Sequence, residues 1–439
     1  MRALEELSRT ILLCRDYVID AASDVEICRC LQARQVLCVS DLRNLSTHSG
    51  QTALVTLVSL LNRMGLQVHL EIPEIAMLLP QPPLYGSFLR QALLKSSETL
   101  IAGATVQLGK SFGPEVIFVL GDTAFEVGDV LSWRLYGGDW HGGLTHGGKA
   151  PAWTAQWPVG GMVSAALAAN EAFKFVVRRL PLRQGSDEVY FEPSRSCEWD
   201  FGPVAAPVDG IDIGKVDMIS AGAISQASLY SLLRLPRLRM SGRVFDDDVT
   251  GPSNLNRNML TVAKDVGLAK VQVIARHCGP DLRVEPVAAR FKGELAESER
   301  LSARVLVGVD DIPSRWDVRR RAPGWLAVSG TSHFGILSSV HCLVDPCSGC
   351  LHPIDEEAGS RPIPTISYVS FWAGLAMTVR LVREAIGHPY PRGRQQLWLV
   401  PLRMDEPHAA TWSPVAARPD CPVQCLASQS LRASRQAAA

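Results

Sequence analysis

The sequence predicts an α/β fold of two doubly wound, Rossmann-like domains, of which the N-terminal one is degenerate. Short apolar runs that end in small or acidic residues alternate with longer helical patterns, as in βαβ units, and this series occurs twice. Each series closes with a helix that begins at a proline, continues through small residues and ends basic, over residues 158–180 and 364–386. We therefore interpret the chain as a diverged internal duplication, with each closing helix packed on its own sheet.

Length and composition indicate a globular protein. The 439 residues leave room for two domains with complete cores. Lys plus Arg and Asp plus Glu number 44 each, so net charge predicts neither a nucleic-acid partner nor a membrane partner. No run approaches the roughly 20 apolar residues of a membrane-spanning helix, and the N-terminus lacks the pattern of a secretion signal. Eleven scattered cysteines favour a reduced, cytoplasmic protein with a metal site over a disulfide framework.

The first half has the outline of a nucleotide-binding fold. No glycine cluster that could bind phosphate follows its first strand, and no Asn-Leu-X-Arg run occurs. We therefore expect residues 1–180 to form a domain that keeps the architecture and has lost the ligand. Its expected elements are a helical segment, a βαβ unit and a further strand that ends in Gly-Asp, over residues 1–30, 35–41, 49–65, 66–72 and 115–122.

A glycine-rich stretch, residues 136–149, carries His141 and His146. It lacks the Gly-Lys-Ser/Thr ending of a Walker loop. We expect a mobile surface loop here, and a metal or phosphate role for the two histidines is the alternative.

Domain boundaries follow from changes in composition. Residues 181–214 are rich in proline, glycine and charge without a sustained period, which is typical of a linker. The second domain is then expected over residues 215–425. The remaining tail, residues 426–439, is expected to be disordered.

The second domain begins with a strand, a turn and a helix in "DMISAGAISQASLYSLL". In this turn Ser220, Gly222 and Ser225 stand where a dinucleotide-binding fingerprint has three glycines. Asp246 ends the next strand, where an acidic residue can accept hydrogen bonds from ribose hydroxyls. The sequence thus predicts the start of a nucleotide site whose backbone approaches phosphate less closely than a glycine turn would allow.

Four polar residues after this strand suit a site that handles phosphates. Asn254 and Arg257 lie in "SNLNR", and an arginine fork suits phosphate oxygens. Lys270, thirteen residues after Arg257, supplies a point charge, and Asp310 follows the strand "RVLVGV", where it suits magnesium. Taken singly, each has an ordinary explanation as a helix cap, a capped loop or a solvated side chain.

Together these residues resemble one family, the adenylyltransferases that activate ubiquitin and the small sulfur carriers, over about residues 215–390. The resemblance implies that Asp246 and Gly222 contact the nucleotide and that Arg257 and Lys270 contact the phosphates of ATP. It implies that Asp310 holds Mg²⁺. It also implies that Asn254 orients the phosphates and that Arg315 braces the site, while Asp311 stands where the family often has Asn. In such enzymes an arginine often comes from the partner domain, and Arg9 or Arg15 is the candidate here.

Two cysteine pairs form a zinc-binding pattern. Cys347 and Cys350 lie in "PCSGC", and Cys421 and Cys425 lie in "DCPVQC". Four thiolates in two pairs suit a tetrahedral structural Zn²⁺ site, which would attach the C-terminal segment to the domain. The alternative is four unrelated buried thiols.

The segment that carries the acyl-accepting cysteine in thioester-forming relatives has none here. Asp355 takes that position when the sequences are aligned on "EAG". Either the enzyme passes the acyl-adenylate directly to a partner, or a hydroxyl accepts the acyl group as an oxyester. Ser360 is the first candidate for that hydroxyl and Thr365 the second. His352 is the one histidine in the vicinity.

The resemblance implies ATP-dependent activation of a ubiquitin-like protein that ends in glycine, followed by transfer to a conjugating enzyme. The two halves would form a built-in pseudo-dimer, and pairing of two chains as a homodimer stays open. One alternative is adenylation of a peptide or sulfur-carrier substrate. The other is a non-catalytic pseudoenzyme scaffold, which the degenerate glycine turn favours and the intact polar set opposes.

Overall fold

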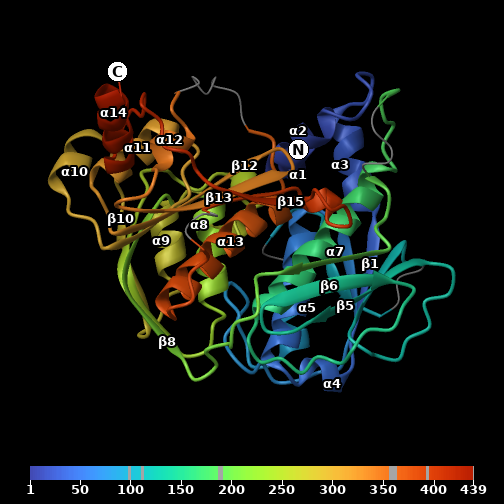
Figure 1. The fold of residues 1–439 in the computed structure, drawn as a ribbon. Coiled ribbons are helices and arrows are strands. Elements are labelled where there is room, and N and C mark those ends of the chain that lie inside the picture. Colours follow the sequence, from blue (N-terminus) through green and yellow to red (C-terminus); the bar gives the residue numbers. More distant parts are fainter. Residues whose placement is uncertain (97–99, 110–112, 186–190, 355–362, 392–394, 439) are drawn as a thin grey trace.

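Two mixed β-sheets with helices on their faces make up the chain in the computed structural model, which describes residues 1–96, 100–109, 113–185, 191–354, 363–391 and 395–438. Figure 1 shows the two sheets next to each other, with helices gathered between them. The seven-stranded sheet has the order β3-β2-β1-β4-β5-β6-β7. The eight-stranded sheet has the order β10-β9-β8-β11-β12-β13-β14-β15.

The first half builds the seven-stranded sheet. Its strands are β1 (Gln35–Val39), β2 (Gln67–Glu71), β3 (Val106–Leu108), β4 (Val116–Leu120), β5 (Leu131–Gly137), β6 (His141–His146) and β7 (Ser196–Asp200). Its helices are α1 (Arg2–Glu6), α2 (Ser8–Arg15), α3 (Asp24–Ala33), α4 (Leu42–Leu45), α5 (His48–Arg63), α6 (Leu89–Ser96) and α7 (Val159–Val177).

The second half builds the eight-stranded sheet. Its strands are β8 (Ile211–Ile219), β9 (Leu238–Phe245), β10 (Leu282–Val287), β11 (Arg304–Val307), β12 (Trp325–Ser332), β13 (Gly335–Cys342), β14 (Gln396–Leu399) and β15 (Ala410–Ser413). Its α-helices are α8 (Ala223–Leu232), α9 (Lys270–Ala275), α10 (Gly293–Ser298), α11 (Ile312–Arg320), α12 (Ser348–Leu351), α13 (Ser367–Ala385) and α14 (Leu426–Ala438).

The two sheets have the same topology. Five strands run parallel in each, in the orders β3-β2-β1-β4-β5 and β10-β9-β8-β11-β12, and antiparallel strands follow at one edge. Strand β4, "VIFVL", is buried throughout, as a parallel strand covered on both faces should be. The predicted fold of two doubly wound Rossmann-like domains is confirmed.

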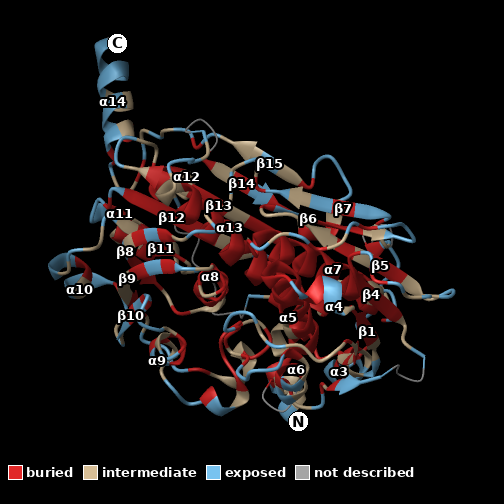
Figure 2. Cartoon of the chain, turned by 90° about the horizontal axis from the view of Figure 1, so that it is seen from below, coloured by how far each residue is buried: buried red, intermediate tan, exposed pale blue. Residues whose placement is uncertain are grey.

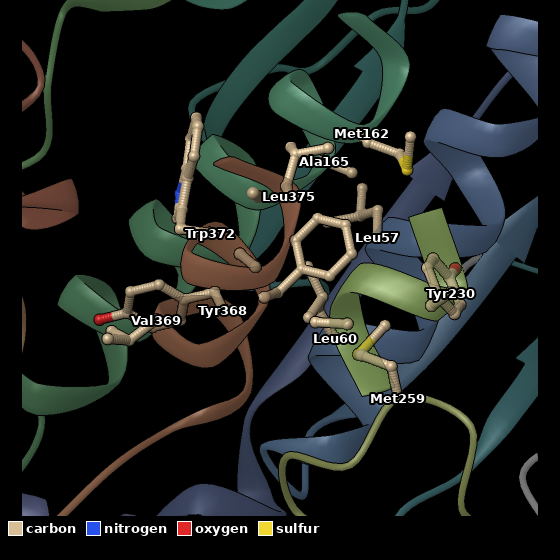
Figure 3. Packing of buried hydrophobic residues seen from close by; sticks show 14 of the residues in the cluster. Leu57, Leu60, Met162, Ala165, Tyr230, Met259, Tyr368, Val369, Trp372 and Leu375 are labelled. Carbon is tan, nitrogen blue, oxygen red and sulfur yellow. The ribbon is translucent and has the colours of Figure 1, made fainter. Parts of the chain in front are cut away.

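Four helices fill the space between the sheets: α5 and α7 from the first half, α8 and α13 from the second. Figure 3 shows Leu57, Met162, Tyr230 and Trp372 from these helices in one apolar cluster, and the buried centre of Figure 2 is the same region. The largest cluster of buried side chains therefore spans both halves.

Two helix crossings in this interface depend on glycine. A Cβ at Gly161 of α7 would lie 2.5 Å from the Ser49 carbonyl oxygen, and a Cβ at Gly374 of α13 would lie 2.5 Å from the Ala227 Cβ. Both distances are far below van der Waals contact. The closing helix of each half thus approaches the first helix of its own βαβ unit through a glycine, α7 on α5 and α13 on α8.

The prediction of a mobile loop over residues 136–149 is wrong. Strands β5 and β6 form a hairpin there, and glycine is required at position 142 because α7 lies so close. A Cβ at Gly142 would lie 2.3 Å from the Gly160 carbonyl oxygen. His146 donates from Nδ1 to the Ser132 carbonyl at 2.7 Å, so it serves the hairpin. Composition alone does not separate a flexible glycine run from one selected for close packing.

The predicted linker and tail also differ from the structure. Strand β7 lies inside residues 181–214 and completes the first sheet, and β8 already begins at Ile211. As an edge strand in a charged context, "SCEWD" shows little apolar alternation. The tail is not disordered in its described part: it forms α14, an exposed helix that Figure 2 shows projecting from the body. Its composition, without glycine or proline, favours helix.

Within the part of the chain that the structure describes, none of the helices has the length and apolar character that a bilayer span requires.

Candidate active site

The predicted site residues gather at the carboxyl ends of three neighbouring strands. Strand β8 lies between β9 and β11, and the register pairs Ile219 with both Phe245 and Val307. The turn after β8, the residues after β9 and the residues after β11 therefore meet at one edge of the sheet. The strand order reverses at β8, and ligands of open α/β sheets bind at such a switch point.

The turn after β8 is shaped by side chains where relatives of this fold use glycines. Ser220 has a positive φ of 92°, and its Oγ accepts a hydrogen bond from Gly222 N at 2.9 Å. The Asp246 carboxylate accepts from Ala221 N at 2.7 Å through Oδ2 and from Asp248 N at 2.8 Å through Oδ1. The structure places Asp246 at the predicted position, and there it joins the turn after β8 to the loop after β9.

Residues 253–261, which we call the site segment, follow this loop. Asn254 accepts a hydrogen bond from Gly251 N at 2.8 Å through Oδ1, so it shapes the entry into the segment. Arg257 donates from Nη1 to Ser253 O and, at 3.0 Å, to Asn256 Oδ1. These bonds leave Nε and Nη2 of Arg257 without a partner among the described residues, which suits a fork awaiting an anion.

Arg9, Arg257 and Arg315 lie close enough to the exposed carboxylate of Asp310 for its charge to raise the pKa of each guanidinium. Burial and the charge of Arg9 lower the pKa of Arg257 to about 9, against the opposing charge of Asp310. Burial also lowers the pKa of Arg9, from the N-terminal half, again opposed by Asp310. Burial lowers the pKa of Arg315 to about 10. All three stay protonated at neutral pH. Asp311 also acts on Arg315, and the three arginines still outnumber the two carboxylates, so positive charge is in surplus.

The structure distinguishes the two candidate arginines of the N-terminal half. Arg9 lies at the site and donates from Nη1 to the Ile363 carbonyl at 3.1 Å. Arg15 instead pairs with Asp24 at 2.5 Å. Arg9 is therefore the arginine that the first half contributes to this edge of the second sheet.

Lys270 lies beside the loop after β9. It is the first residue of α9, and its Nζ pairs with Asp248, whose backbone N donates to Asp246. Asp246 and Lys270 thus belong to one connected network. The carboxylates of Asp246, Asp247 and Asp248 lie within 4.8 Å of one another. Asp248 was missed at the sequence level, although the run of three aspartates signals it.

Asp311 and Arg315 shape the turn that carries Asp310. Asp311 caps α11 by accepting from Ser314 N at 2.9 Å, and it lies 3.6 Å from Arg290. Burial would raise its pKa, but the bonds from Ser314 outweigh burial and lower it. Arg315 donates to the Val309 carbonyl at 3.0 and 2.8 Å. Asp310 itself accepts no hydrogen bond from another described residue, so its carboxylate is free for a ligand.

The equivalent position in the first half is filled by protein. After β1, the fully buried side chain of Asn44 donates to Asp41 Oδ1 at 3.0 Å and lies 3.0 Å from Thr123 Oγ1. Its Oδ1 accepts from Trp153 N at 2.9 Å. A Cβ at Gly121 would lie 2.2 Å from the same oxygen. Side chains and main chain thus fill the edge of the first sheet after β1.

The four predicted zinc ligands lie together, buried, in the second half. The Sγ atoms of Cys347 and Cys421 are 3.5 Å apart, those of Cys350 and Cys425 are 3.6 Å apart, and all four lie within 4.8 Å. Sulfurs bound tetrahedrally at about 2.3 Å from zinc would be about 3.8 Å apart, so the set fits Zn²⁺. Gly349 N donates to Cys347 Sγ at 3.2 Å, a bond that favours a thiolate.

The acyl-acceptor candidates are only partly described. Asp355 and Ser360 lie outside the described residues. Thr365 is buried, and its hydroxyl is 3.2 Å from Ser370 Oγ. Burial and the charge of Arg315 lower the pKa of His352 to about 4, and its Nε2 has no partner among the described residues.

Comparison with known proteins assigns the second half to a class. The ThiF family profile matches residues 242–423, and the profile of the BilD N-terminal domain matches residues 35–185. The C-terminal half is a ThiF-family domain of the E1-like adenylyltransferase superfamily, which confirms the resemblance. The first half matches a different profile, that of the BilD N-terminal domain.

Individual relatives cover part of the chain. The SAMP-activating enzyme E1 of Haloferax volcanii is 34% identical over 126 residues, 27% of this chain and 47% of that protein. The uncharacterized protein y4jF of Sinorhizobium fredii is 27% identical over 153 residues, 34% of this chain and 30% of that protein. The matches thus span less than half of each curated relative. MccB of E. coli, solved with AMPCPP and MccA, has a TM-score of 0.40 and 17% identity, and the match covers 48% of this chain and 66% of that chain.

Proposed function

We propose that this chain adenylates the C-terminal carboxylate of a small ubiquitin-like protein at the edge of its second sheet. The proposal rests on Arg257 and Arg315, which hydrogen bonds fix in the loops at the switch point, and on Arg9 from the first half, all three within reach of the charge of Asp310 in a segment that matches the ThiF family. A surplus of positive charge beside the exposed carboxylate of Asp310 suits a triphosphate with its metal. The name of the SAMP-activating relative supports a small protein as the substrate.

In the proposed reaction, a carboxylate oxygen of the partner attacks the α-phosphorus of ATP. The new bond joins that oxygen to phosphorus, the bond between the α-phosphorus and the α,β-bridging oxygen breaks, and pyrophosphate leaves with the electron pair. Arg9 and Arg257 would offset the negative charge that develops on the phosphates. Mg²⁺, held by Asp310, would neutralise phosphate charge further. Lys270 would break its ion pair with Asp248 and contact the phosphates instead.

The products are an acyl-adenylate and pyrophosphate. We propose that the acyl group then moves to a conjugating enzyme, either directly or through an oxyester. For the oxyester, Ser360 is the candidate, and trapping an intermediate that survives Ser360→Ala would exclude it. The buried hydroxyl of Thr365 is the weaker candidate. We propose that Zn²⁺ at the four cysteines is structural.

The testing experiment is pyrophosphate exchange with ATP. A ubiquitin-like protein ending in glycine and a short peptide ending in a free carboxylate are compared as substrates with Mg²⁺. We expect exchange with the protein, and its loss in Arg257→Met. Exchange with the peptide alone would favour adenylation of a peptide substrate. If millimolar ATP with Mg²⁺ does not change the melting temperature of the wild-type chain, the alternative of a non-catalytic scaffold is favoured.

A further inference from the structure

Arg63, the last residue of α5 in the first half, reaches into the second half. Its guanidinium is fully buried and donates from Nη1 to Leu255 O at 2.6 Å, and from Nη2 to Met259 O at 3.0 Å and Thr261 O at 2.9 Å. All three carbonyls belong to the site segment. Burial lowers the pKa of Arg63 to about 10, so the group remains charged at neutral pH.

An arginine is suited to this task for geometric reasons. Its planar fork presents several donors at fixed angles, whereas a lysine ammonium is a point charge that would reach fewer of the carbonyls. A buried cation without an ion pair is costly unless several dipoles converge on it. Arg63 forms no salt bridge with another described residue, so the three carbonyls provide that compensation. The three carbonyls therefore stabilise the buried charge of Arg63, and Arg63 in turn holds the site segment in its curved shape.

A second hydrogen bond from the first half reaches the same segment. Asn256 Nδ2 donates to Thr10 Oγ1 at 3.0 Å, and both side chains are fully buried. Asn256 Oδ1 in turn accepts from Arg257 Nη1 at 3.0 Å. A continuous chain of hydrogen bonds thus runs from the first half to the proposed phosphate-binding arginine. Figure 3 shows Met259 of the segment within the interhelix cluster.

The other side of the segment is held by α8. Gln226 Oε1 accepts from Leu260 N at 3.1 Å and from Thr261 Oγ1 at 3.0 Å, while its Nε2 donates to Ala221 O at 3.1 Å. Ala221 belongs to the turn after β8. The site segment is thus fixed between Arg63 of the degenerate half and the turn of the active half.

We infer that Arg63 is a positioning residue: it holds the site segment in the shape that presents Arg257 to the phosphates of ATP. The degenerate half thereby completes the ATP site through main-chain contacts as well as through Arg9. This inference rests on the proposed adenylation function, because it assumes that Arg257 meets a nucleotide.

The test compares two buried arginines of the same interface, in the full chain. Arg63→Lys keeps the charge and loses the fork. Its matched control is Arg234→Lys, since Arg234 is also buried and, among the described residues, donates only to Tyr230 O and Pro82 O, both at 2.9 Å and both outside the site segment. The dissociation constant of AMPCPP with Mg²⁺ is measured by calorimetry, and the melting temperature is measured without ligand.

We expect both substitutions to lower the melting temperature and Arg63→Lys alone to weaken AMPCPP binding, by about tenfold or more. Equal affinity for wild type and Arg63→Lys would overturn the inference while leaving the ATP site intact. Equal weakening in Arg234→Lys would also overturn it, since a loosened interface would then explain the effect. A wild-type chain that does not bind AMPCPP would instead refute the proposed function itself.

A milder substitution covers the case in which Arg63→Lys does not fold. Thr10→Val removes one hydroxyl and keeps the side-chain shape, so the fold should persist. We expect AMPCPP to bind a few-fold more weakly to Thr10→Val. Unchanged affinity in that variant would count against the inference.

Discussion

At the scale of single residues, two adjacent aspartates have different tasks. Asp311 accepts a hydrogen bond from Ser314 and caps α11, whereas Asp310 is exposed and accepts no hydrogen bond from a described residue, although its charge acts on three arginines. The sequence predicted a magnesium role for Asp310 because this carboxylate follows the strand "RVLVGV" and because the family resemblance implies that role. The structure explains why its neighbour cannot share that role.

Replacing Asp310 by Asn tests this division. The amide keeps the shape and removes the charge, so we expect exchange of pyrophosphate into ATP to fall by about 100-fold or more. Asp311→Ala should instead cost about 1 kcal/mol of unfolding free energy through the lost helix cap and change exchange only a few-fold. Both variants are assayed for exchange and for urea unfolding. Equal losses of exchange would contradict the separate roles.

The sequence could not show which arginine of the first half, Arg9 or Arg15, reaches the proposed ATP site. Arg9 and Arg15 are both on α2, and hundreds of residues separate them from Asp310, so no spacing rule applies. Arg63 gave no sequence signal at all, because its partners are main-chain carbonyls, which every residue carries. Contacts of this kind become visible only when the two halves are packed together.

At the scale of elements, the helices between the sheets can cross closely because glycine, which has no side chain, stands at the crossing points. A Cβ on Gly374 would lie 2.5 Å from Ala227 Cβ and 2.5 Å from Ile224 O, and neither atom is the flexible end of a side chain. The strands and closing helices were predictable from apolar runs and small-residue content. The hairpin of β5 and β6 was not, since Gly142 serves close packing against α7 and other glycines of the hairpin pack against the hairpin itself.

Gly374→Ala should therefore destabilise the interface. We expect a loss of about 1–3 kcal/mol in unfolding free energy, as for other overpacked cores. Gly279→Ala is the matched control, because a Cβ at Gly279 meets no atom within 4 Å. Chemical denaturation followed by circular dichroism measures both. A neutral result for Gly374→Ala would mean that α8 and α13 do not pack as described.

The cysteine cluster joins α12 to the segment that precedes α14, and a metal there would link distant parts of the chain. We expect about one zinc per chain by elemental analysis, and loss of the metal with a lower melting temperature in Cys350→Ser. Cys278→Ser, outside the cluster, should keep the metal. Zinc content unchanged by Cys350→Ser would contradict the site.

At the scale of the whole molecule, the two halves are one structural unit, and two buried histidines lie at the contact between them: His48 on α5 and His277 in the turn after α9. Burial lowers the pKa of His48 to about 4, and its Nε2 donates to Arg234 O across the interface at 2.7 Å. Burial and the charge of Arg276 likewise lower the pKa of His277 to about 4. His277 donates from Nε2 to Leu260 O, so its Nδ1 accepts from the Tyr85 hydroxyl at 2.5 Å.

These histidines predict that acid weakens the assembly of the halves. Between pH 6.5 and 4 these histidines are protonated in the unfolded chain and neutral in the native protein. The free energy of unfolding therefore falls as the pH falls through that window. Each group contributes a slope of up to about 1.4 kcal/mol per pH unit. Urea midpoints at pH 7 and pH 5 measure the effect, and His48→Asn should reduce the slope. An unchanged slope in that variant would contradict the assignment.

The central claim is that the two halves together build a pocket that transfers AMP to a carboxylate. The most direct measurement supplies ATP labelled on the α-phosphate, or on the γ-phosphate, with a ubiquitin-like protein ending in glycine, and follows the label onto that protein after an acid quench. We predict that the α label appears on the protein and the γ label leaves with pyrophosphate, and that Arg9→Met abolishes the transfer while the exposed Arg43→Met does not. Label from the γ-phosphate on the protein, or full transfer by Arg9→Met, would contradict the account.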